Sequence, residues 1–451
     1  MSFDYELPDG WSWKTIEEVQ ESPKGATITG PFGSSIGKKF FVEKGVPVIR
    51  GNNLSLGMTP FIDDGFVYVS EEKADELKRY KSIADDLLFT AAGTIGQVGI
   101  IPKKSKYDEY IISNKQLRAR LDTTVVDPTY AYYWFSSKPM VEYIKRQDTG
   151  STIPLINLGV LRSLPLPVPP LDVQVRIRKI LKSFDKKIWI NTQTNQTLEA
   201  MAQAIFKSWF VDFDPVKAKM NGEQPEGMDA ATASLFPEKL VESALGLIPE
   251  GWEVGDLSDL MDFNPKRTLK KGTIAPYLDM KNMPTSGHLA LDIYDREMGS
   301  GTKFKNGDSL LARITPCLEN GKTAYVDFLE DEQVGWGSTE YIVMRSKSDS
   351  YKYFSYYMAR FEPFRKFAIQ SMTGTSGRQR AQAQTVQTMP FAIPPISILE
   401  KFDEFVAPNM QMIKSHGSEN RTLSALRDTL LPKLLSGEIE LGQAQELAEV
   451  E

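Results

Sequence analysis

The chain has 451 residues, 41% of them hydrophobic and 25% charged, which is typical of a globular protein with two or three cores. A formal charge of −6 counts against a nucleic-acid binder, although acidic residues gather in 223–242 and 438–451, so lysine and arginine can cluster elsewhere. A single cysteine excludes an internal disulfide and a multi-cysteine zinc site. With no signal-type start and no membrane-spanning run, we expect a cytoplasmic protein without a membrane partner.

Residues 1–168 predict a first globular domain of mixed α/β (α+β) class, because short alternating apolar runs are separated by glycine and proline. The runs most typical of strands are 66–69, 87–89, 98–101 and 117–121, and helices are expected over 71–81 and 128–145.

Residues 169–212 predict a long central spacer helix. Apolar or near-apolar positions step by alternating fours and threes, which is a coiled-coil heptad seam: Ile177, Leu181, Phe184, Ile188, Asn191, Asn195, Leu198, Ala202, Ile205 and Trp209. A helix of this length extends for about 60 Å, far more than a globular core needs. Residues 213–246 then form a linker that contains the first acidic segment.

The second half repeats this arrangement. Residues 247–393 predict a second globular domain, residues 394–437 a distal spacer helix and residues 438–451 an acidic tail. Strands are expected over 309–312, 323–326 and 341–345, and a helix over 351–369. The distal seam comprises Phe402, Val406, Asn409, Ile413, His416, Asn420, Leu423, Arg427, Leu430 and Leu434, in which Asn409 and Arg427 are the weakest positions.

Four polar residues fall at equivalent seam positions: Asn191 with His416, and Asn195 with Asn420. One interpretation is a surface-facing turn or a break in each helix. The other is a set of buried polar groups that fixes the register of two antiparallel helices at a cost in stability.

Short motifs occur twice in the same order, which indicates an internal pseudo-twofold repeat. Residues 7–11 (Leu-Pro-Asp-Gly-Trp) recur at 248–252 (Ile-Pro-Glu-Gly-Trp), and the proline-rich run after 164 recurs after 389. The pairs Asp86 and Asp308, Thr149 and Thr373, and Leu198 and Leu423 keep a nearly constant spacing. The interval from Gly10 to Asp86 is 19 residues longer than the interval from Gly251 to Asp308, so the scaffold repeats while part of the content differs.

Motifs for catalysis are weak. Residues 33–39 are one residue short of a phosphate loop, and neither half carries the Asn/Asp-Pro-Pro-aromatic tetrapeptide of DNA amino-methyltransferases. His288 and His416 are expected on solvated surface and Cys317 as a packing residue. We therefore expect no catalytic, cofactor-binding or metal-binding residue in this chain, although scattered acids such as Glu71 leave a nuclease open.

Polar and basic residues of the kinds that contact phosphates and base edges are found in loops of both halves. Each is also compatible with ordinary solvated surface, and the Thr-Gly-Ser and Thr-Gly-Thr turns with plain packing turns. The candidate DNA-binding residues are Ser34, Ser35, Lys38, Lys39, Arg50, Asn52, Asn53, Asn114, Lys115, Gln116, Arg118, Thr149, Ser151, Lys266, Arg267, Asn282, Arg313, Thr373, Thr375, Arg378 and Arg380.

Over nearly its whole length the chain resembles the specificity subunits of type I restriction-modification systems. The resemblance is carried by the two Leu/Ile-Pro-x-Gly-Trp motifs, the Gly-Pro-Phe-Gly-Ser element at 30–34, the turn at 149–151, the proline-rich run 164–171, and the distal 423–437 segment. The second half has no counterpart of 30–34, so contacts of that loop do not transfer to it.

This resemblance implies two target-recognition domains separated by two long antiparallel coiled-coil helices, each domain reading one half of a bipartite double-stranded DNA target. It implies no catalysis in this chain. It also implies partners, namely two modification subunits that use S-adenosylmethionine to methylate adenine, and restriction subunits that use ATP and Mg²⁺. The alternatives are a protein-assembly scaffold that does not read DNA and a stand-alone nicking enzyme.

Overall fold

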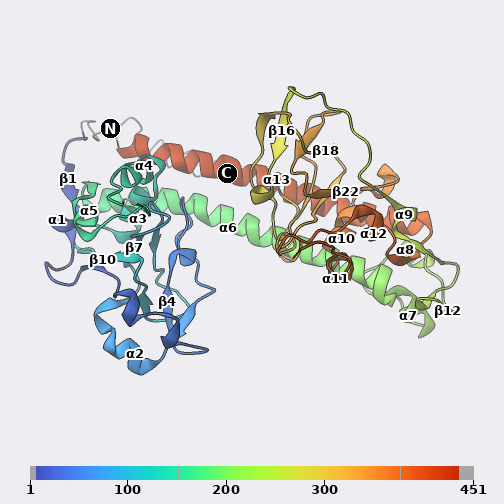
Figure 1. Cartoon of the computed structure of the whole chain (residues 1–451), viewed down its shortest axis with the longest axis horizontal. Helices are drawn as coiled ribbons and strands as arrows, with labels where there is room; N and C mark the ends of the chain where they lie inside the picture. The colour runs from blue at the N-terminus through green and yellow to red at the C-terminus, as the bar shows by residue number, and fades with distance from the viewer. Residues whose placement is uncertain (1–6, 151, 376, 436–451) are drawn as a thin grey trace. The chain divides into compact units, whose positions relative to one another are not determined.

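A computed structural model describes residues 7–150, 152–375 and 377–435, and contacts divide these residues into two compact units (Figure 1). The first unit contains the described residues up to Ile188 together with those from Arg421, and the second unit is Trp189–Asn420. Both units combine β-sheets with helices, which confirms the predicted mixed α/β class.

The first unit contains three sheets. The strand pair is β1 (Ser12–Thr15) with β11 (Pro165–Val168). The antiparallel four-stranded sheet has the order β2 (Thr27–Thr29), β10 (Gln116–Ala119), β7 (Leu87–Thr90), β8 (Val98–Ile100). The five-stranded sheet has the order β3 (Phe41–Val42), β5 (Val67–Val69), β4 (Val46–Ile49), β9 (Tyr110–Ile112), β6 (Lys81–Ser82), and its β4 and β9 are parallel.

The second unit has corresponding sheets. The strand pair is β14 (Glu253–Asp256) with β23 (Pro390–Ile393). One four-stranded sheet has the order β15 (Met261–Phe263), β22 (Tyr341–Ser346), β19 (Ser309–Ala312), β20 (Thr323–Tyr325). The other has the order β17 (Tyr294–Glu297), β16 (Ile274–Leu278), β21 (Gly335–Gly337), β18 (Thr302–Phe304), with β16 and β21 parallel. The strands expected at 309–312, 323–326 and 341–345 coincide with β19, β20 and β22.

The helix expected over 128–145 is interrupted. It forms as α3 (Pro128–Ser136) and α4 (Lys138–Arg146), separated by extended backbone at Ser137. Pro139 explains the break, because proline cannot donate the helical hydrogen bond and clashes with the carbonyl of the preceding turn.

The helix expected over 351–369 breaks for the same reason, at Phe361 before Pro363. It forms as α10 (Phe354–Arg360) and α11 (Glu362–Gln370), after a 3₁₀ turn at Asp349–Tyr351.

The remaining short helices sit near strand ends. The helix expected over 71–81 ends early, as α2 (Glu71–Glu76) followed by a 3₁₀ turn at Lys78–Tyr80. The others are α1 (Ile16–Val19) and α5 (Leu158–Ser163) in the first unit, and α9 (Leu257–Leu260) and α12 (Ala383–Val386) in the second.

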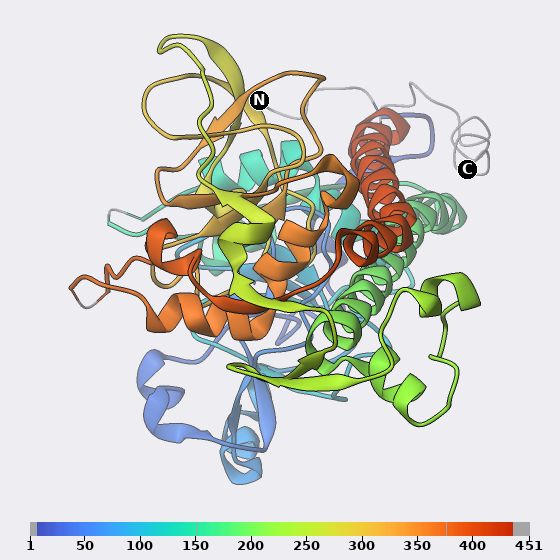
Figure 2. The ribbon, with the colours of Figure 1, turned by 90° about the vertical axis from the view of Figure 1, so that its right-hand side faces the viewer.

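Two long helices are present, as the sequence predicted: α6 (Leu171–Lys207) and α13 (Ile396–Leu435), with a π-helical turn at Ser208–Asp212 after α6. In the second unit, Asn191 hydrogen-bonds Asn420 and Asn195 contacts Ile413, so the two helices run antiparallel there (Figure 2). In the first unit, Arg427 of α13 pairs with Asp185 of α6, with 2.6 Å between Nη1 and Oδ1.

Two predicted seam positions shift by one residue along the second half of α6. Glu199 is buried in place of Leu198 and Phe206 in place of Ile205, whereas Ala202 and Trp209 are buried as predicted. Glu199 accepts a 2.6 Å hydrogen bond from the Tyr356 hydroxyl of α10, which compensates for part of its desolvation. The sequence did not predict this shift, because a glutamate is expected to face solvent and not to occupy a buried seam position.

The segment 213–246, expected to be a plain linker, is folded. It contains α7 (Asp214–Met220), α8 (Ala230–Ser234) and the hairpin of β12 (Leu240–Ser243) with β13 (Gly246–Pro249). Val216 and Phe236 are buried in the same core as Trp209 and Trp252. The acidic residues of the segment therefore belong to a folded part of the second unit.

Asp403 is a buried carboxylate on α13. It accepts a 2.7 Å hydrogen bond from the Tyr353 backbone N–H and is 6% exposed. Burial raises the pKa of Asp403 to about 7, against the lowering effects of that hydrogen bond and of Lys352.

We predict that Asp403→Asn stabilises the second unit progressively as pH rises. Between about pH 4 and 7 the unfolded chain ionises Asp403 while the folded chain keeps the proton, so wild-type stability falls across this window. The asparagine cannot ionise and retains an acceptor for Tyr353. At about 1.4 kcal/mol per pKa unit, denaturant unfolding of the full chain should show a variant advantage that grows by a few kcal/mol. Glu404→Gln, which alters an exposed neighbour, is the control; a pH-independent difference for Asp403→Asn would contradict the assignment.

Candidate nucleic-acid interface

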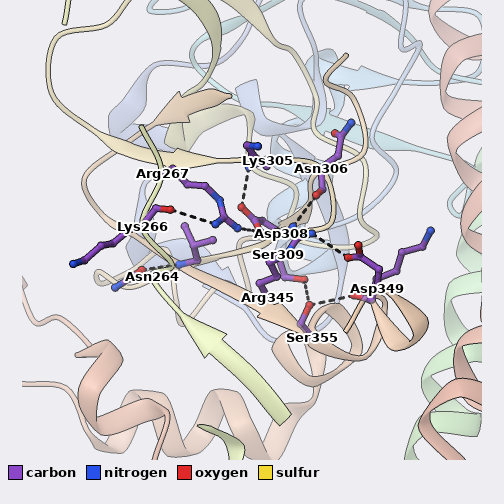
Figure 3. Close-up of polar contacts among 12 residues, drawn as sticks. Asn264, Lys266, Arg267, Lys305, Asn306, Asp308, Ser309, Arg345, Asp349 and Ser355 are labelled. Carbon is purple, nitrogen blue, oxygen red and sulfur yellow. Dashed lines mark hydrogen bonds and ion pairs between the residues drawn. The ribbon is translucent and has the colours of Figure 1, made fainter. Parts of the chain in front are cut away.

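Asp308, immediately before β19, is a buried carboxylate that is bonded on both of its oxygens (Figure 3). It is fully buried, and its Oδ1 lies 3.0 Å from both Arg267 Nη2 and Arg345 Nη1. Its Oδ2 accepts a 2.8 Å hydrogen bond from the Lys305 backbone N–H. A buried carboxylate is tolerated only when its lone pairs are satisfied in this way, so Asp308 fixes where both guanidinium groups lie.

Asp86 occupies the same place at the start of β7 in the first unit. It is also fully buried, and it accepts the Ile83 backbone N–H at 2.9 Å and two hydrogen bonds from Arg120 at 2.7 and 2.8 Å. Arg118 Nε lies 4.0 Å from the same carboxylate. The two strand starts are therefore built by one local design.

A buried amide and hydroxyl network joins the loops of the first unit. Gln116 hydrogen-bonds Ser113 and contacts Thr90 at 3.5 Å, and Thr90 donates to Gln97 at 2.9 Å. Gln97 in turn donates to the carbonyls of Gly51 and Leu54. Loops that are distant in sequence are thus held in one fixed arrangement, which leaves Asn52, Asn114 and Lys115 exposed around it.

In the second unit, the place of Lys115 is taken by Glu340. The backbone N–H of Arg313 donates to the Glu340 carbonyl as Ala91 donates to Lys115. The Glu340 carboxylate accepts bonds of 2.8 and 2.9 Å from Arg380 and lies 3.4 Å from Arg313 Nε. The Arg380 hydrogen bonds hold the pKa of Glu340 below its ordinary value.

A hollow of about 310 Å³ opens where the two four-stranded sheets of this unit meet. Its three charged lining residues are Arg267, Lys303 and Arg313, and hydroxyl and amide groups come from Thr302, Thr339 and Asn264. The sequence analysis missed Lys303, Thr302, Thr339 and Asn264. They reach the hollow only through the pairing of β18 with β21 and of β15 with β22, which no local motif reveals.

Four candidate residues are buried, which corrects their assignment as DNA contacts. Arg118 is 4% exposed and donates to the carbonyls of Gly25 and Lys81, and Gln116 belongs to the network above. Asn53 caps its own turn through Arg50 N–H and the carbonyls of Ile62 and Asp64. Asn282 lies in the matching turn of the second unit and is 8% exposed, and its Nδ2 has no hydrogen-bond partner among the described residues. Burial withdraws all four side chains from the surface that DNA could reach, and the bonds of Arg118, Gln116 and Asn53 give those three a structural role.

The other candidates lie on the surface or partly on it. Ser35, Arg50, Arg267, Arg313 and Arg380 are partly exposed. Ser34, Lys38, Lys39, Asn52, Asn114, Lys115, Thr149, Lys266, Thr373, Thr375 and Arg378 are exposed. Ser151 lies outside the described residues.

The threonine turns make ordinary loop contacts. The Thr149 backbone N–H and hydroxyl both donate to the Leu155 carbonyl, at 2.9 and 3.1 Å. Thr373 and Arg380 exchange backbone hydrogen bonds at 3.1 and 2.9 Å. These contacts close the turns, whose threonine residues are exposed, and a role at DNA phosphates remains a prediction.

The four polar seam residues meet across α6 and α13 in the second unit. Asn191 Nδ2 donates to Asn420 Oδ1 at 3.0 Å and to Glu419 at 2.6 Å, and His416 Nδ1 lies 2.7 Å from Asn195 Oδ1. The contacts pair residues from opposite helices.

Both histidines differ from expectation. His416 is half-buried in this seam, and His288 is fully buried, with Nε2 3.3 Å from Asp327 and its ring against the edges of Tyr325 and Tyr356. The solvated-surface prediction for both was wrong, because neighbouring charge gave no sign of the tertiary packing.

Metal-binding clusters and membrane-spanning helices are both absent from the described residues. No group of three or more histidine, cysteine, aspartate or glutamate side chains in 7–150, 152–375 and 377–435 could hold a metal ion. Within the same ranges no helix is long and apolar enough to cross a membrane.

Comparisons with known proteins agree with one another. Residues 8–200 match the family model described as "Type I restriction modification DNA specificity domain". The chain is 26% identical to the type I restriction enzyme MjaIX specificity subunit of Methanocaldococcus jannaschii, over 96% of this chain and 95% of that protein. It is also 26% identical to the HindI specificity subunit of Haemophilus influenzae, over 74% and 82%. A crystal structure of the type I restriction-modification S subunit from M. genitalium has the same fold, with a TM-score of 0.50 at 15% identity over 96% and 97% of the chains.

We predict that Asp308→Asn destabilises the second unit by about 3 kcal/mol, because it leaves two arginines facing a neutral partner in a buried site. Hydrogen exchange should quicken in β19 and β22. The matched control is Asp349→Asn, which removes an exposed partner of Arg345 and should cost under about 1 kcal/mol. Equal effects of the two substitutions would show that Asp308 does not anchor the site.

Proposed function

The chain belongs to the specificity subunits of type I restriction-modification systems, and on that premise we propose that each globular domain reads one half of a bipartite DNA target. The helices α6 and α13 set the spacing between the half-sites and dock two modification subunits. Recognition is the contribution of this chain, while methylation with S-adenosylmethionine and ATP- and Mg²⁺-dependent restriction belong to its partners.

One observation carries the proposal: the two units share their scaffold and differ in the side chains that the scaffold presents. Ile83 and Lys305 make the same backbone bond to Asp86 and Asp308, and Gly10 and Gly251 both adopt a φ of +81°, which favours glycine. This match supports an internal duplication.

The presented residues diverge at equivalent backbone positions. Ala91, Lys115 and Leu155 of the first unit correspond by hydrogen bonding to Arg313, Glu340 and Arg380 of the second. A pair of readers for two different sequences requires this combination of constant frame and variable charge, because base contacts carry specificity.

The proposed boundaries follow the same logic. The first recognition domain is 1–168 and the second 247–393, with spacer helices at 169–212 and 394–437. Residues 1–6 and 436–437 of these ranges, and the acidic tail at 438–451, lie outside the described residues. The folded segment 213–246 joins the central helix to the second domain. Among the seam residues, we propose that Asn191, Asn195, His416 and Asn420 fix helix register, since a one-residue slip would leave these amides unpaired.

A salt titration with duplex DNA separates this function from a scaffold that does not read DNA. An affinity for DNA that falls steeply as the salt concentration rises indicates phosphate contacts. A scaffold that only binds proteins should show no such salt-dependent DNA binding.

We predict that exchanging residues 247–388 for the equivalent domain of a relative changes one half of the methylated motif only. Methylome sequencing of a host that expresses the chimaera with its modification subunit is the measurement. Loss or change of both halves in a chimaera that still methylates would refute independent reading by the two domains.

We also predict that a heptad inserted at matched positions of α6 and α13 lengthens the nonspecific spacer. Seven residues keep the seam register and add about 10.5 Å, equivalent to about three base pairs. The half-sites themselves should stay the same. An insertion into α6 alone is the control, because it breaks the pairing and should abolish activity; an unchanged spacer in the active double insertion would show that the helices are not the ruler.

A further inference from the structure

The charged residues that line the hollow of the second unit are all cationic, although the chain as a whole is acidic. Arg267, Lys303 and Arg313 line it, and no carboxylate is among the described residues that do so. The carboxylates that pair with these arginines do not line the hollow, and each of them pairs with two arginines. Asp308 serves Arg267 and Arg345, and Glu340 serves Arg313 and Arg380.

Donor capacity remains unused in the hollow. The Nε atom of Arg267 is enclosed and donates no hydrogen bond, whereas that of Arg313 lies 3.4 Å from Glu340 Oε2. Lys303 has no carboxylate partner within the described residues. Asn264 uses its Oδ1 to accept the Val343 backbone N–H at 2.9 Å, which leaves its amide N–H groups available. Buried donors without acceptors are costly, so the site favours a ligand that brings several acceptor oxygens.

The ligand chemistry that fits is a phosphodiester. A phosphate offers negative charge and acceptor oxygens, which guanidinium groups bind by paired hydrogen bonds and which threonine hydroxyls complement. A volume of about 310 Å³ corresponds to about ten waters at ~30 Å³ each, enough for one phosphate with part of its hydration.

The first unit lacks this arrangement. Ala91 stands at the position of Arg313, as the shared backbone bonds show. Lys81 pairs with Ile111 in β9 as Lys303 pairs with Trp336 in β21, but the Lys81 ammonium is taken by Glu109 at 2.7 Å and Asp75 at 3.5 Å. At these two matched positions, the first unit therefore has no counterpart of Arg313, and its lysine is already paired with carboxylates.

We propose that this hollow binds one backbone phosphate of the DNA, in the second unit only, and so fixes the position of the second half-site against that domain. The inference rests on the proposed DNA-reading function. It makes the two domains unequal: the second supplies a salt-dependent anchor that the first does not have.

The test uses the assembled complex with its modification subunits and duplex DNA that carries the motif identified by methylome sequencing. The variant is Lys303→Gln with Arg313→Gln, which leaves Glu340 bonded to Arg380. The slope of log affinity against log salt should become shallower by about 0.9 for the one lost phosphate contact. Lys81→Gln, at the matching position of the first unit, should leave the slope unchanged, and Lys303→Arg with Arg313→Lys should restore most of it.

A second measurement locates the phosphate. Single methylphosphonate substitutions scanned across the second half-site should weaken wild-type binding about tenfold at one position, the loss expected for a charge-assisted hydrogen bond. The same substitution should cost the glutamine variant almost nothing, because the contact is already absent.

Three outcomes would overturn the inference. An unchanged salt slope would show that the hollow holds no phosphate, and an altered methylated motif at constant slope would make it a base reader. A complex that binds no DNA at all would instead remove the proposed function on which the inference rests.

Discussion

A buried carboxylate at the start of one strand determines the placement of the arginines in each unit. Asp86 and Asp308 are fully enclosed, so each must be bonded on both oxygens by a backbone N–H and by guanidinium groups. That requirement ties the strand start to the neighbouring strand through Arg120 or Arg345. Loops that leave these strands consequently start from fixed positions, and their side chains can vary without moving the frame.

The long helices follow a similar principle with amides in place of ions. Apolar contacts hold α6 and α13 together wherever the seam is hydrophobic, but apolar contacts alone tolerate slippage. The Asn191–Asn420 and Asn195–His416 contacts are specific to one alignment, and Arg427 with Asp185 adds a charged contact in the first unit. A helix pair with a single register suits the proposed role of spacer between the two recognition domains, because its length then has one value.

Local features of the fold were predictable from sequence, and long-range ones were not. The strands β7, β8, β19 and β22 were predicted from apolar runs in the sequence. The helix breaks before Pro139 and Pro363 could also have been predicted from the sequence, because proline disfavours a continuous helix. By contrast, Gln116 and Arg118 are polar and were predicted to lie on the surface. Both are interior, because β10 is buried on both faces.

The candidate site shows the same division. Arg267 and Arg313 were singled out as loop cations, whereas Lys303 was not, because only the pairing of β18 with β21 carries it to the hollow. Burial of Glu199, Asp403 and His288 likewise depends on tertiary packing that no periodicity encodes.

Under the proposed function, this chain alone chooses the DNA sequence on which its complex acts. The direct test is methylome sequencing of a host that expresses one fixed modification subunit with this chain, compared with the same host in which a relative replaces it. We expect a two-part motif with a spacer of constant length that changes when the specificity chain is replaced. A motif that stays the same after replacement, or that has no division into two halves, would contradict the proposed function.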